Sequence, residues 1–408
     1  MSLSSTLWHR LTIGAPGNHK SYSLSLASSI TERGADEWHA ACGGHADAVM
    51  DPRFLMAVEK SMAAEARFHN VVFRDSAGEP VGAAFLSLYT ADALLLASER
   101  WKKVGTQIRQ LWPSFLKIPV LFCGCPVSTG ESHLRMAAGA DHSTMLRQLD
   151  RLLALLAWRQ CAPAIVFKDF GPQEIVRTDA LLELGYVRAD SLPMNYFPAR
   201  FRDFDHFCDS LRSRYRRQIV RSRRKLQRAG LRVVHLRGGM GFDELYTDDV
   251  HRLYSAVLSR APIQLERLPA QFFRELARQL PEESAFTLIC QGDRVVGFTC
   301  GVFNRQSYHN LFCGFDYALN AEAELYFNLL YEDLDYALRQ NVRSIQIGQT
   351  ADEYKMRVGC HREPRYFYLK VREPGLQLLL RAGGSSLFPP APDVNERNLF
   401  RQSDEDAF

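Results

Sequence analysis

A four-residue sequence that occurs twice limits the possible folds of this 408-residue chain more than any other feature. The run Leu-Phe-Cys-Gly from Leu121 to Gly124 recurs from Leu311 to Gly314. Upstream of each copy, at residues 71–83 and 288–298, two β-rich runs flank a polar turn that contains glycine. Such an arrangement is the usual signal of a β-hairpin. A sequence repeat in this context indicates a duplicated structural unit.

The elements that follow each copy also repeat. Leucines at helical spacing predict long helices, and short β-branched runs predict the strands after them. The predicted helices are 144–159 and 322–339, the strands after them 164–167 and 344–347, and the last strands 195–197 and 366–370. The same order in both halves predicts a tandem duplication of one α/β unit, with helices on both faces of a mixed sheet.

The repeat also predicts the domain boundaries. We expect an N-terminal domain over residues 1–203 and a C-terminal domain over 204–381, which opens with a basic helix at 204–229. Residues 382–408 are rich in Gly, Ser, Pro and charge, so they have little to bury and we expect a disordered tail.

Composition excludes several classes of protein. The chain is 46% hydrophobic and 24% charged, which is unlike wholly disordered, collagen-like or coiled-coil proteins. The net charge of +4 is too small to predict a nucleic-acid or membrane partner for the whole chain. No apolar run reaches the roughly 18 residues of a membrane span, and the N-terminus lacks a signal-peptide core. We therefore expect a cytoplasmic protein, with peripheral contact at the inner face of the membrane as an open alternative.

Cysteine usage does not indicate a disulfide framework or a metal centre. The nine cysteines are odd in number and scattered. Cys123 and Cys125 form the one close pair, without a second pair or a histidine cluster at ligand spacing. We expect reduced, buried cysteines and no metal.

The most strongly charged segment is Arg212–Arg228, which carries nine basic residues and no acid. An apolar stripe at helical spacing predicts that one face of this helix docks and the remainder is cationic. The candidate anion-binding residues are Arg216, Arg217, Arg223 and Arg224. The cationic face is either merely solvated or contacts substrate phosphates, tRNA or anionic lipid. Tyr215 is the one aromatic residue in the run, which makes RNA the less favoured partner.

The element order resembles the GNAT acyltransferase fold, and the second half is similar to the branch related to Fem-type peptidyltransferases. The matching segments are 213–226, 314–317 and 348–359, the last with a Tyr354-Lys355 pair followed by Gly359. The similarity is good over 204–370 and faint over 32–200. It implies an N-acyltransferase in lipid or cell-envelope metabolism. The donor would be acyl-CoA or a carrier thioester, and the acceptor a primary amine of an amino sugar, an amino acid or a lipid amine such as a sphingoid base.

One departure keeps the donor open. GNAT enzymes that use acetyl-CoA carry a glycine-rich turn that binds the pyrophosphate at the start of the long helix. Here residues 316–323 contain neither glycine nor a basic residue. Fem-type relatives also lack that turn, because their donor is an aminoacyl-tRNA. The alternatives are thus a Fem-like aminoacyltransferase and a catalytically inactive module that binds an anionic surface.

The resemblance also places the chemistry. In this fold two parallel strands separate at mid-sheet, and here they would be residues 308–313 and 344–347. His309 on the first strand is a candidate general base, with Leu311 and Cys313 expected on the same face. The further candidates lie at the strand exit and the start of the long helix: Asp316, Tyr317, Glu322 and Glu324. Turn formation and helix-dipole interactions remain the alternative roles of these residues.

Lys355 is the strongest candidate, since the Fem-type lysine at this place lies beside the reacting carbonyl. Its ammonium would stabilise the oxyanion or the leaving group, and Tyr354 would supply a proton. The alternatives are a solvated lysine and a packed tyrosine. The first half has no Tyr-Lys pair in its corresponding segment, 179–185. We therefore predict one active site, in the second half, and a degenerate first half.

Overall fold

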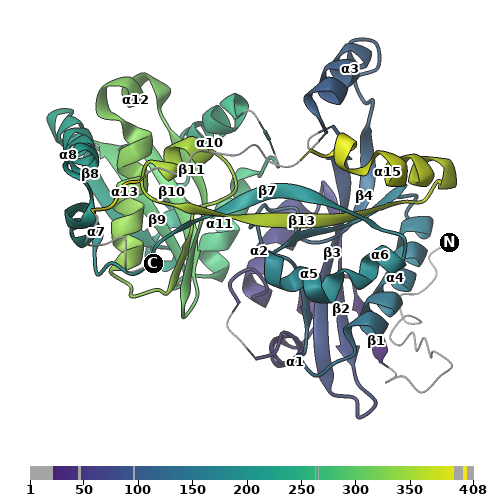
Figure 1. Cartoon of the computed structure of the whole chain (residues 1–408). Coiled ribbons are helices and arrows are strands. Elements are labelled where there is room, and N and C mark those ends of the chain that lie inside the picture. The colour runs from purple at the N-terminus through teal and green to yellow at the C-terminus, as the bar shows by residue number, and fades with distance from the viewer. Residues whose placement is uncertain are drawn as a thin grey trace. The chain divides into compact units, whose positions relative to one another are not determined.

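The computed structural model describes residues 22–44, 47–94, 97–261, 263–264, 266–389 and 398–401. The chain divides into two compact units, and Figure 1 shows their elements. Unit 1 comprises Met1–Pro193 and Pro364–Pro392, and unit 2 comprises Met194–Glu363 and Asp393–Phe408.

The sheet of unit 1 has the strand order β1-β2-β3-β4-β6-β13, with β5 paired to β3. Its strands are β1 (Ser23–Ala27), β2 (Ala66–Arg74), β3 (Pro80–Asp92), β4 (Lys117–Cys123), β5 (Leu134–Met136), β6 (Ala164–Phe170) and β13 (His361–Val371). Every pair is antiparallel except β4 with β6, which is parallel.

The sheet of unit 2 repeats this pattern in the order β8-β9-β10-β11-β12-β7. Its strands are β8 (Arg232–Arg237), β9 (Ser284–Gln291), β10 (Arg294–Phe303), β11 (Ser307–Phe315), β12 (Ser344–Gln346) and β7 (Val187–Phe197). Only β11 and β12 are parallel among these pairs of described strands. The repeated sequence thus lies on β4 and β11, the equivalent strands of the two sheets, and the predicted tandem α/β fold is confirmed.

The last strand of each sheet comes from the other half of the sequence. β7 pairs with β12 through Tyr196 and Gln346, whereas β13 pairs with β6 through Tyr368 and Phe167. Residues 194–197 of β7 and 364–371 of β13 lie in the opposite units from those that a boundary at residue 203 would give them, whereas residues 187–193 of β7 lie in unit 1. The exchange is the feature of the fold that the repeat does not predict.

Helices cover both units. In unit 1 they are α1 (Ala35–Ala41), α2 (Pro52–Met62), α3 (Glu99–Arg109), α4 (His142–Arg159), α5 (Pro172–Thr178), α6 (Ala180–Glu183) and α15 (Pro374–Leu387). In unit 2 they are α7 (Phe204–Ser210), α8 (Ser213–Arg228), α9 (Phe242–Leu245), α10 (Asp248–Arg260), α11 (Ala270–Gln279), α12 (Tyr317–Ala323), α13 (Leu325–Leu338) and α14 (Asp352–Met356).

The expected disordered tail is partly ordered. α15 continues to Leu387, beyond the residue 381 at which we expect order to end. Leu399 and Phe400 are buried in unit 2, where Phe400 bridges to Leu211. The remaining stretches of the expected tail, 390–397 and 402–408, lie outside the described residues.

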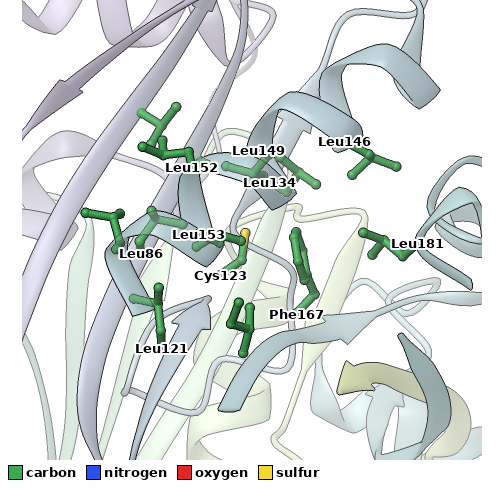
Figure 2. Close-up of a cluster of buried hydrophobic side chains, with 14 of the residues drawn as sticks. Leu86, Leu121, Cys123, Leu134, Leu146, Leu149, Leu152, Leu153, Phe167 and Leu181 are labelled. Atoms are coloured by element: carbon green, nitrogen blue, oxygen red, sulfur yellow. The ribbon is translucent and has the colours of Figure 1, made fainter. Parts of the chain in front are cut away.

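The core of unit 1 forms where α4 packs on the sheet. Asp141 caps α4 by accepting a hydrogen bond from Thr144 N, and the leucines that follow recur at helical spacing. Leu149 and Leu153 are fully buried against residues of β4 and β6, including Phe167 (Figure 2). The leucine pattern that predicts this helix is therefore its core face.

Candidate functional site

The two parallel strands of unit 2 separate where the resemblance places the chemistry. β11 and β12 pair from Ser307 with Ser344 to His309 with Gln346, and the pairing then ends although β11 continues to Phe315. Beyond β12 the chain turns at Gly348, whose φ of 82° favours glycine. The edge of β11 after His309 therefore has no ladder partner on this side among the described residues.

Asn195 on β7 holds the turn in place. Its backbone pairs with the chain on either side of the turn, through Ile347 N and Gly348 O. Its side-chain amide donates to Gly348 O and to Asp352 Oδ1, both at 2.9 Å. Asn195 thus fixes both the turn and the start of α14, the helix that carries Lys355. No motif in the sequence singles out this asparagine.

Lys355 lies between the separated strands. A Cβ atom at Gly348 would lie 3.4 Å from Lys355 Nζ and 3.9 Å from Asn310 O, which places all three groups together. The lysine is only 6% exposed, and its ammonium makes no hydrogen bond or ion pair within the described chain. Burial lowers the pKa of Lys355 to about 8, although nearby Asp352 favours the charged form. A desolvated cation at this place fits the predicted role.

Aromatic side chains gather around Tyr354, the residue before this lysine. Tyr354 is 44% exposed, and its ring lies 5.5 Å from that of Tyr326. Burial raises the pKa of Tyr326, and its neighbours Cys313, Tyr354 and Tyr317 add to the shift. The predicted residues Lys355, Tyr354 and Tyr317 therefore come together, and Tyr326 joins them from α13.

His309 does not join this group. Tyr308 and Asn310 both donate to Asp333 on α13, so His309 between them points to the opposite face of the sheet. A bulge in the pairing of β10 with β11 then skips Leu311 and reverses the alternation. The expectation that His309 and Cys313 share a face is wrong for this reason.

The bulge places Cys313 on the α13 side. Cys313 is paired with Thr299, which donates to Asp333, and opposite residues of a strand pair share a face. His309 itself is buried and makes a 2.8 Å hydrogen bond between its Nε2 and Ser307 Oγ. The imidazole therefore bonds to a neighbouring side chain of its own strand and does not belong to the group around Lys355.

Two of the three acidic candidates have structural roles. Asp316 caps α12 by accepting from Ala318 N, and it pairs with Arg294 at 2.9 Å. Glu324 has a φ of 49° and divides the predicted helix 322–339 into α12 and α13. Its carboxylate accepts from Lys225 Nζ at 2.5 Å. Burial alone would raise the pKa of Glu324, but this hydrogen bond and one from Ser222 lower it. Glu322 lies exposed on α12.

The basic helix α8 has two different cationic faces. Arg223 lies over the ring of Phe204 at 4.8 Å and pairs with Asp205 and Glu332, each at 3.4 Å. Arg216 similarly pairs with Asp209. These two candidates thus join α8 to its own unit.

The second face carries exposed arginines that have no ion pair within the described chain. At helical spacing they form what we call the α8 stripe: Arg214, Arg217, Arg221, Arg224 and Arg228. Arg217 and Arg224 of the predicted set belong to it, whereas the other three were missed. The spacing of the arginines is the signal that distinguishes the two faces.

Within the described residues of unit 1, the parallel pair β4 and β6 does not separate as β11 and β12 do. β4 and β6 stay paired through Cys123 and Phe167. A Cβ atom at Gly124 would collide with Lys168 Cγ, so the Lys168 side chain fills the space beyond the strand end. Its Nζ donates to Cys125 O at 3.0 Å and pairs with Asp169. The two parallel pairs therefore differ in structure; that unit 2 alone is active stays a prediction.

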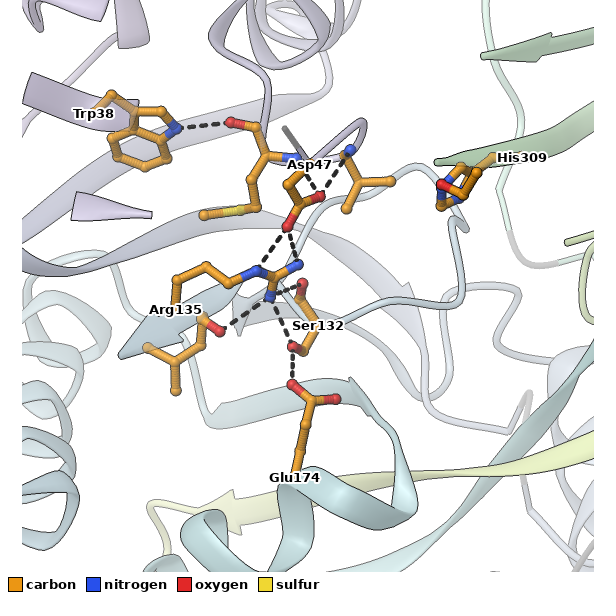
Figure 3. A network of polar contacts seen from close by, with 10 residues as sticks. Trp38, Asp47, Ser132, Arg135, Glu174 and His309 are labelled. Carbon is orange, nitrogen blue, oxygen red and sulfur yellow. Dashed lines mark hydrogen bonds and ion pairs between the residues drawn. The ribbon is translucent and has the colours of Figure 1, made fainter. Parts of the chain in front are cut away.

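The loop after β4 is also tied down (Figure 3). Arg135 Nε donates to Asp47 at 2.7 Å, and its Nη1 donates to the carbonyl and hydroxyl oxygens of Ser132. The Ser132 hydroxyl in turn donates to Glu174 at 2.5 Å. These half-buried contacts lock the loop that corresponds to the α12 region of unit 2.

Among the described residues, no group of three His, Cys, Asp or Glu side chains could hold a metal ion. In the same part of the chain no helix is both long and apolar enough to cross a bilayer.

Comparisons with known proteins agree with this architecture. Residues 119–382, more than half of the chain, match the FemAB-like family, described as peptidoglycan biosynthesis and recognition. The crystal structure of FemX covers 85% of this chain and 98% of its own, with a TM-score of 0.55 and 11% identity. A tandem GNAT protein from the clavulanic acid biosynthesis pathway covers 86% and 99%, with a TM-score of 0.50 and 14% identity. A search of curated proteins by sequence finds no match.

The two similar structures confirm the tandem GNAT-like fold. Because their sequences are only 11% and 14% identical to this chain, they support the fold and not the function. The family match goes further, because it spans β4 to α15 and so includes the strands and helices around Lys355. The protein therefore belongs to the FemAB-like family, a family of Fem-type, GNAT-like transferases.

Proposed function

We propose that unit 2 transfers an acyl group from an activated ester or thioester to a primary amine. The observation that carries this proposal is the Lys355 ammonium, which is buried and has no ionic or hydrogen-bonded partner in the described chain. It lies at the end of two separated strands, where an extended donor can enter. A cation in such a dry site stabilises a developing oxyanion far better than one in water.

The proposed reaction passes through a tetrahedral intermediate and requires proton transfers at the amine and at the leaving group. The amine attacks in its neutral form, and the donor carbonyl becomes a tetrahedral oxyanion beside Lys355 Nζ. Collapse of this intermediate forms the amide and breaks the bond to the leaving oxygen or sulfur. The amine loses one proton and the leaving group gains one; the exposed Tyr354 hydroxyl is suited to pass it on.

Two observations favour an aminoacyl ester on tRNA as the donor. The carboxylate of Asp316 occupies Ala318 N at the start of α12, where a CoA pyrophosphate would need free amides and no negative charge. The α8 stripe supplies five exposed arginines to a polyanion. We therefore place the Fem-like alternative first, with a primary amine of a cell-envelope precursor as the acceptor.

Acyl-CoA is the second candidate, and one observation favours it. The edge of β11 beyond His309 is unpaired on the side of β12, so it can form strand-like hydrogen bonds to the amides of a CoA arm. Both donors would use the same Lys355 chemistry, so the donor assay decides between them.

In the test, the purified protein is incubated with a radiolabelled donor, either aminoacyl-tRNA or acyl-CoA. The acceptors are an amino sugar, an amino acid and a lipid amine. We expect turnover with aminoacyl-tRNA and a loss of about 10²–10³-fold in Lys355→Met, the usual effect of removing one oxyanion donor. Turnover with acyl-CoA alone would support the second candidate. Full activity in Lys355→Met would contradict the proposed site.

A matched pair of charge reversals tests the role of the α8 stripe. The first variant combines Arg217→Glu, Arg221→Glu and Arg224→Glu. The control combines Arg147→Glu, Arg151→Glu and Arg177→Glu, which makes the same charge change at exposed arginines of unit 1 that have no ion pair within the described chain. We expect only the first variant to weaken tRNA binding and to reduce its salt dependence. Equal effects would mean that net charge alone matters.

A further inference from the structure

Helix α3 packs only weakly against the rest of unit 1. It lies between β3 and β4, and Figure 1 shows it beyond the ends of these two strands. Its one buried residue is Gly105, where a Cβ would collide with the side chain of Leu94. Outside this contact, the ion pair of Arg109 with Asp92 ties the helix to β3.

One exposed stripe of α3 is apolar. Trp101, Val104 and Ile108 recur at helical spacing, and Leu111 and Trp112 follow directly after the helix. These side chains are 36–93% exposed, with Leu111 at 93%, Trp112 at 59% and Trp101 at 48%. Five large apolar side chains exposed within twelve residues mark a surface that is covered by something else. We call these five residues the α3 patch.

Cationic side chains border the α3 patch. Arg100 and Lys103 are exposed and form no hydrogen bond or ion pair within the described chain. Glu99 is the one acid between Ser98 and Ile118, and it is paired with Lys102 at 3.0 Å. The border is therefore positively charged and complements an anionic partner.

We propose that α3 is a membrane-docking element that inserts its apolar patch into the surface of an anionic bilayer. Tryptophans suit this place because their rings are stable at the boundary between lipid tails and head groups. The free cations beside them match anionic head groups. A second copy of this chain fits less well, since pairing through the same face would bring Arg100 and Lys103 against their own counterparts.

The orientation of α3 is fixed for such a role. Ser98 N, just before the helix, donates to Leu387 O at the end of α15 at 3.0 Å. Arg109 Nε donates to Phe115 O at 2.9 Å, which closes the loop after the helix. Both ends of the helix are thus held, so the α3 patch is presented as a unit. This inference concerns unit 1 and does not rest on the donor or the acceptor proposed for unit 2.

The test measures flotation of the full chain with vesicles of phosphatidylcholine alone or mixed with phosphatidylglycerol. We expect binding to the mixed vesicles, and a loss of about tenfold or more when Trp101→Ala and Leu111→Ala remove apolar area. The matched control, Trp158→Ala with Val176→Ala, removes one tryptophan and one aliphatic residue that are 65% and 85% exposed elsewhere in unit 1. The control should bind like the wild type.

Two further measurements complete the test. Arg100→Gln with Lys103→Gln should weaken binding to the mixed vesicles, and raising the salt should mimic this effect. Thermal melting checks that all variants fold. Failure of the wild type to bind vesicles, or equal losses in the α3 and control variants, overturns the proposal. So does a monomer–dimer equilibrium that the Trp101→Ala, Leu111→Ala variant abolishes while vesicle binding persists.

Discussion

At the scale of single residues, the proposed chemistry depends on the charge state of Lys355. Burial lowers its pKa to about 8, so near neutral pH the ammonium persists in a place that disfavours it. The nearby Cys313 thiol supplies no compensating negative charge to Lys355, since burial raises the pKa of Cys313 to about 11. A cation held without a partner is costly to the folded state and is stabilised by a developing oxyanion.

This cost predicts how stability depends on pH. Between about pH 8 and 10.5 the unfolded chain keeps the Lys355 proton and the folded chain releases it, so the wild type gains stability as the pH rises. Lys355→Met lacks this gain. We therefore expect the variant to be more stable than the wild type below pH 8 and its advantage to shrink toward pH 10.5, as measured by urea unfolding. A difference that stays constant over this range would show an ordinary, solvated lysine.

The sequence predicts the members of the site better than their geometry. Tyr354 and Lys355 follow from one resemblance, and the structure brings them together with Tyr317. The place of His309 was missed because one bulged residue reverses a strand's faces, and no pattern of apolar residues shows a bulge in advance. Asp316 and Glu324 were ambiguous because carboxylates near a helix start serve capping and catalysis equally well.

At the scale of elements, Asp333 is the main polar anchor of α13. It is buried and accepts hydrogen bonds from three strands: from Thr287 on β9, Thr299 on β10, and Tyr308 and Asn310 on β11. Burial raises its pKa, and the four donors oppose this shift. An aspartate within an apolar helix face is visible in the sequence, but its partners lie on three separate strands.

Removing this anchor tests its importance. Asp333→Ala leaves four donors without their acceptor. We therefore expect the free energy of unfolding to fall by about 3–5 kcal/mol, the usual effect of breaking a buried polar network. Asp249→Ala, a change at an exposed aspartate of α10 that pairs with Arg252, is the control, with an expected loss below about 1 kcal/mol. Chemical denaturation of both variants measures the difference, and similar losses would contradict the role of Asp333.

At the scale of the whole molecule, the exchange of last strands is what the sequence could not predict. β7 and β13 show no regular alternation of buried and exposed residues that would assign either strand to one sheet. Local periodicity identifies a strand but does not name its partner, and a tandem repeat offers two equivalent edges. The element order of both halves, by contrast, follows from turn glycines and leucine spacing that act locally.

The exchange predicts that two tyrosines from the same half of the sequence stabilise different units. Tyr368 on β13 is buried in unit 1, where its hydroxyl bonds to Thr178 and Asp179. Tyr308 on β11 is equally buried in unit 2. Each tyrosine to alanine change should cost about 3–5 kcal/mol, because it opens a cavity and removes hydrogen bonds.

Hydrogen exchange locates the two effects. Tyr368→Ala should speed the exchange of backbone amides in β6, Ala164–Phe170, and leave β9 and β10 protected. Tyr308→Ala should do the reverse, since it removes a donor to Asp333 between α13 and the sheet of unit 2. If Tyr368→Ala instead loosened β9 and β10, β13 would belong to the half of the sequence that encodes it, and the repeat alone would set the architecture. Because the two variants differ from the same protein by one tyrosine each, each variant is the control for the other.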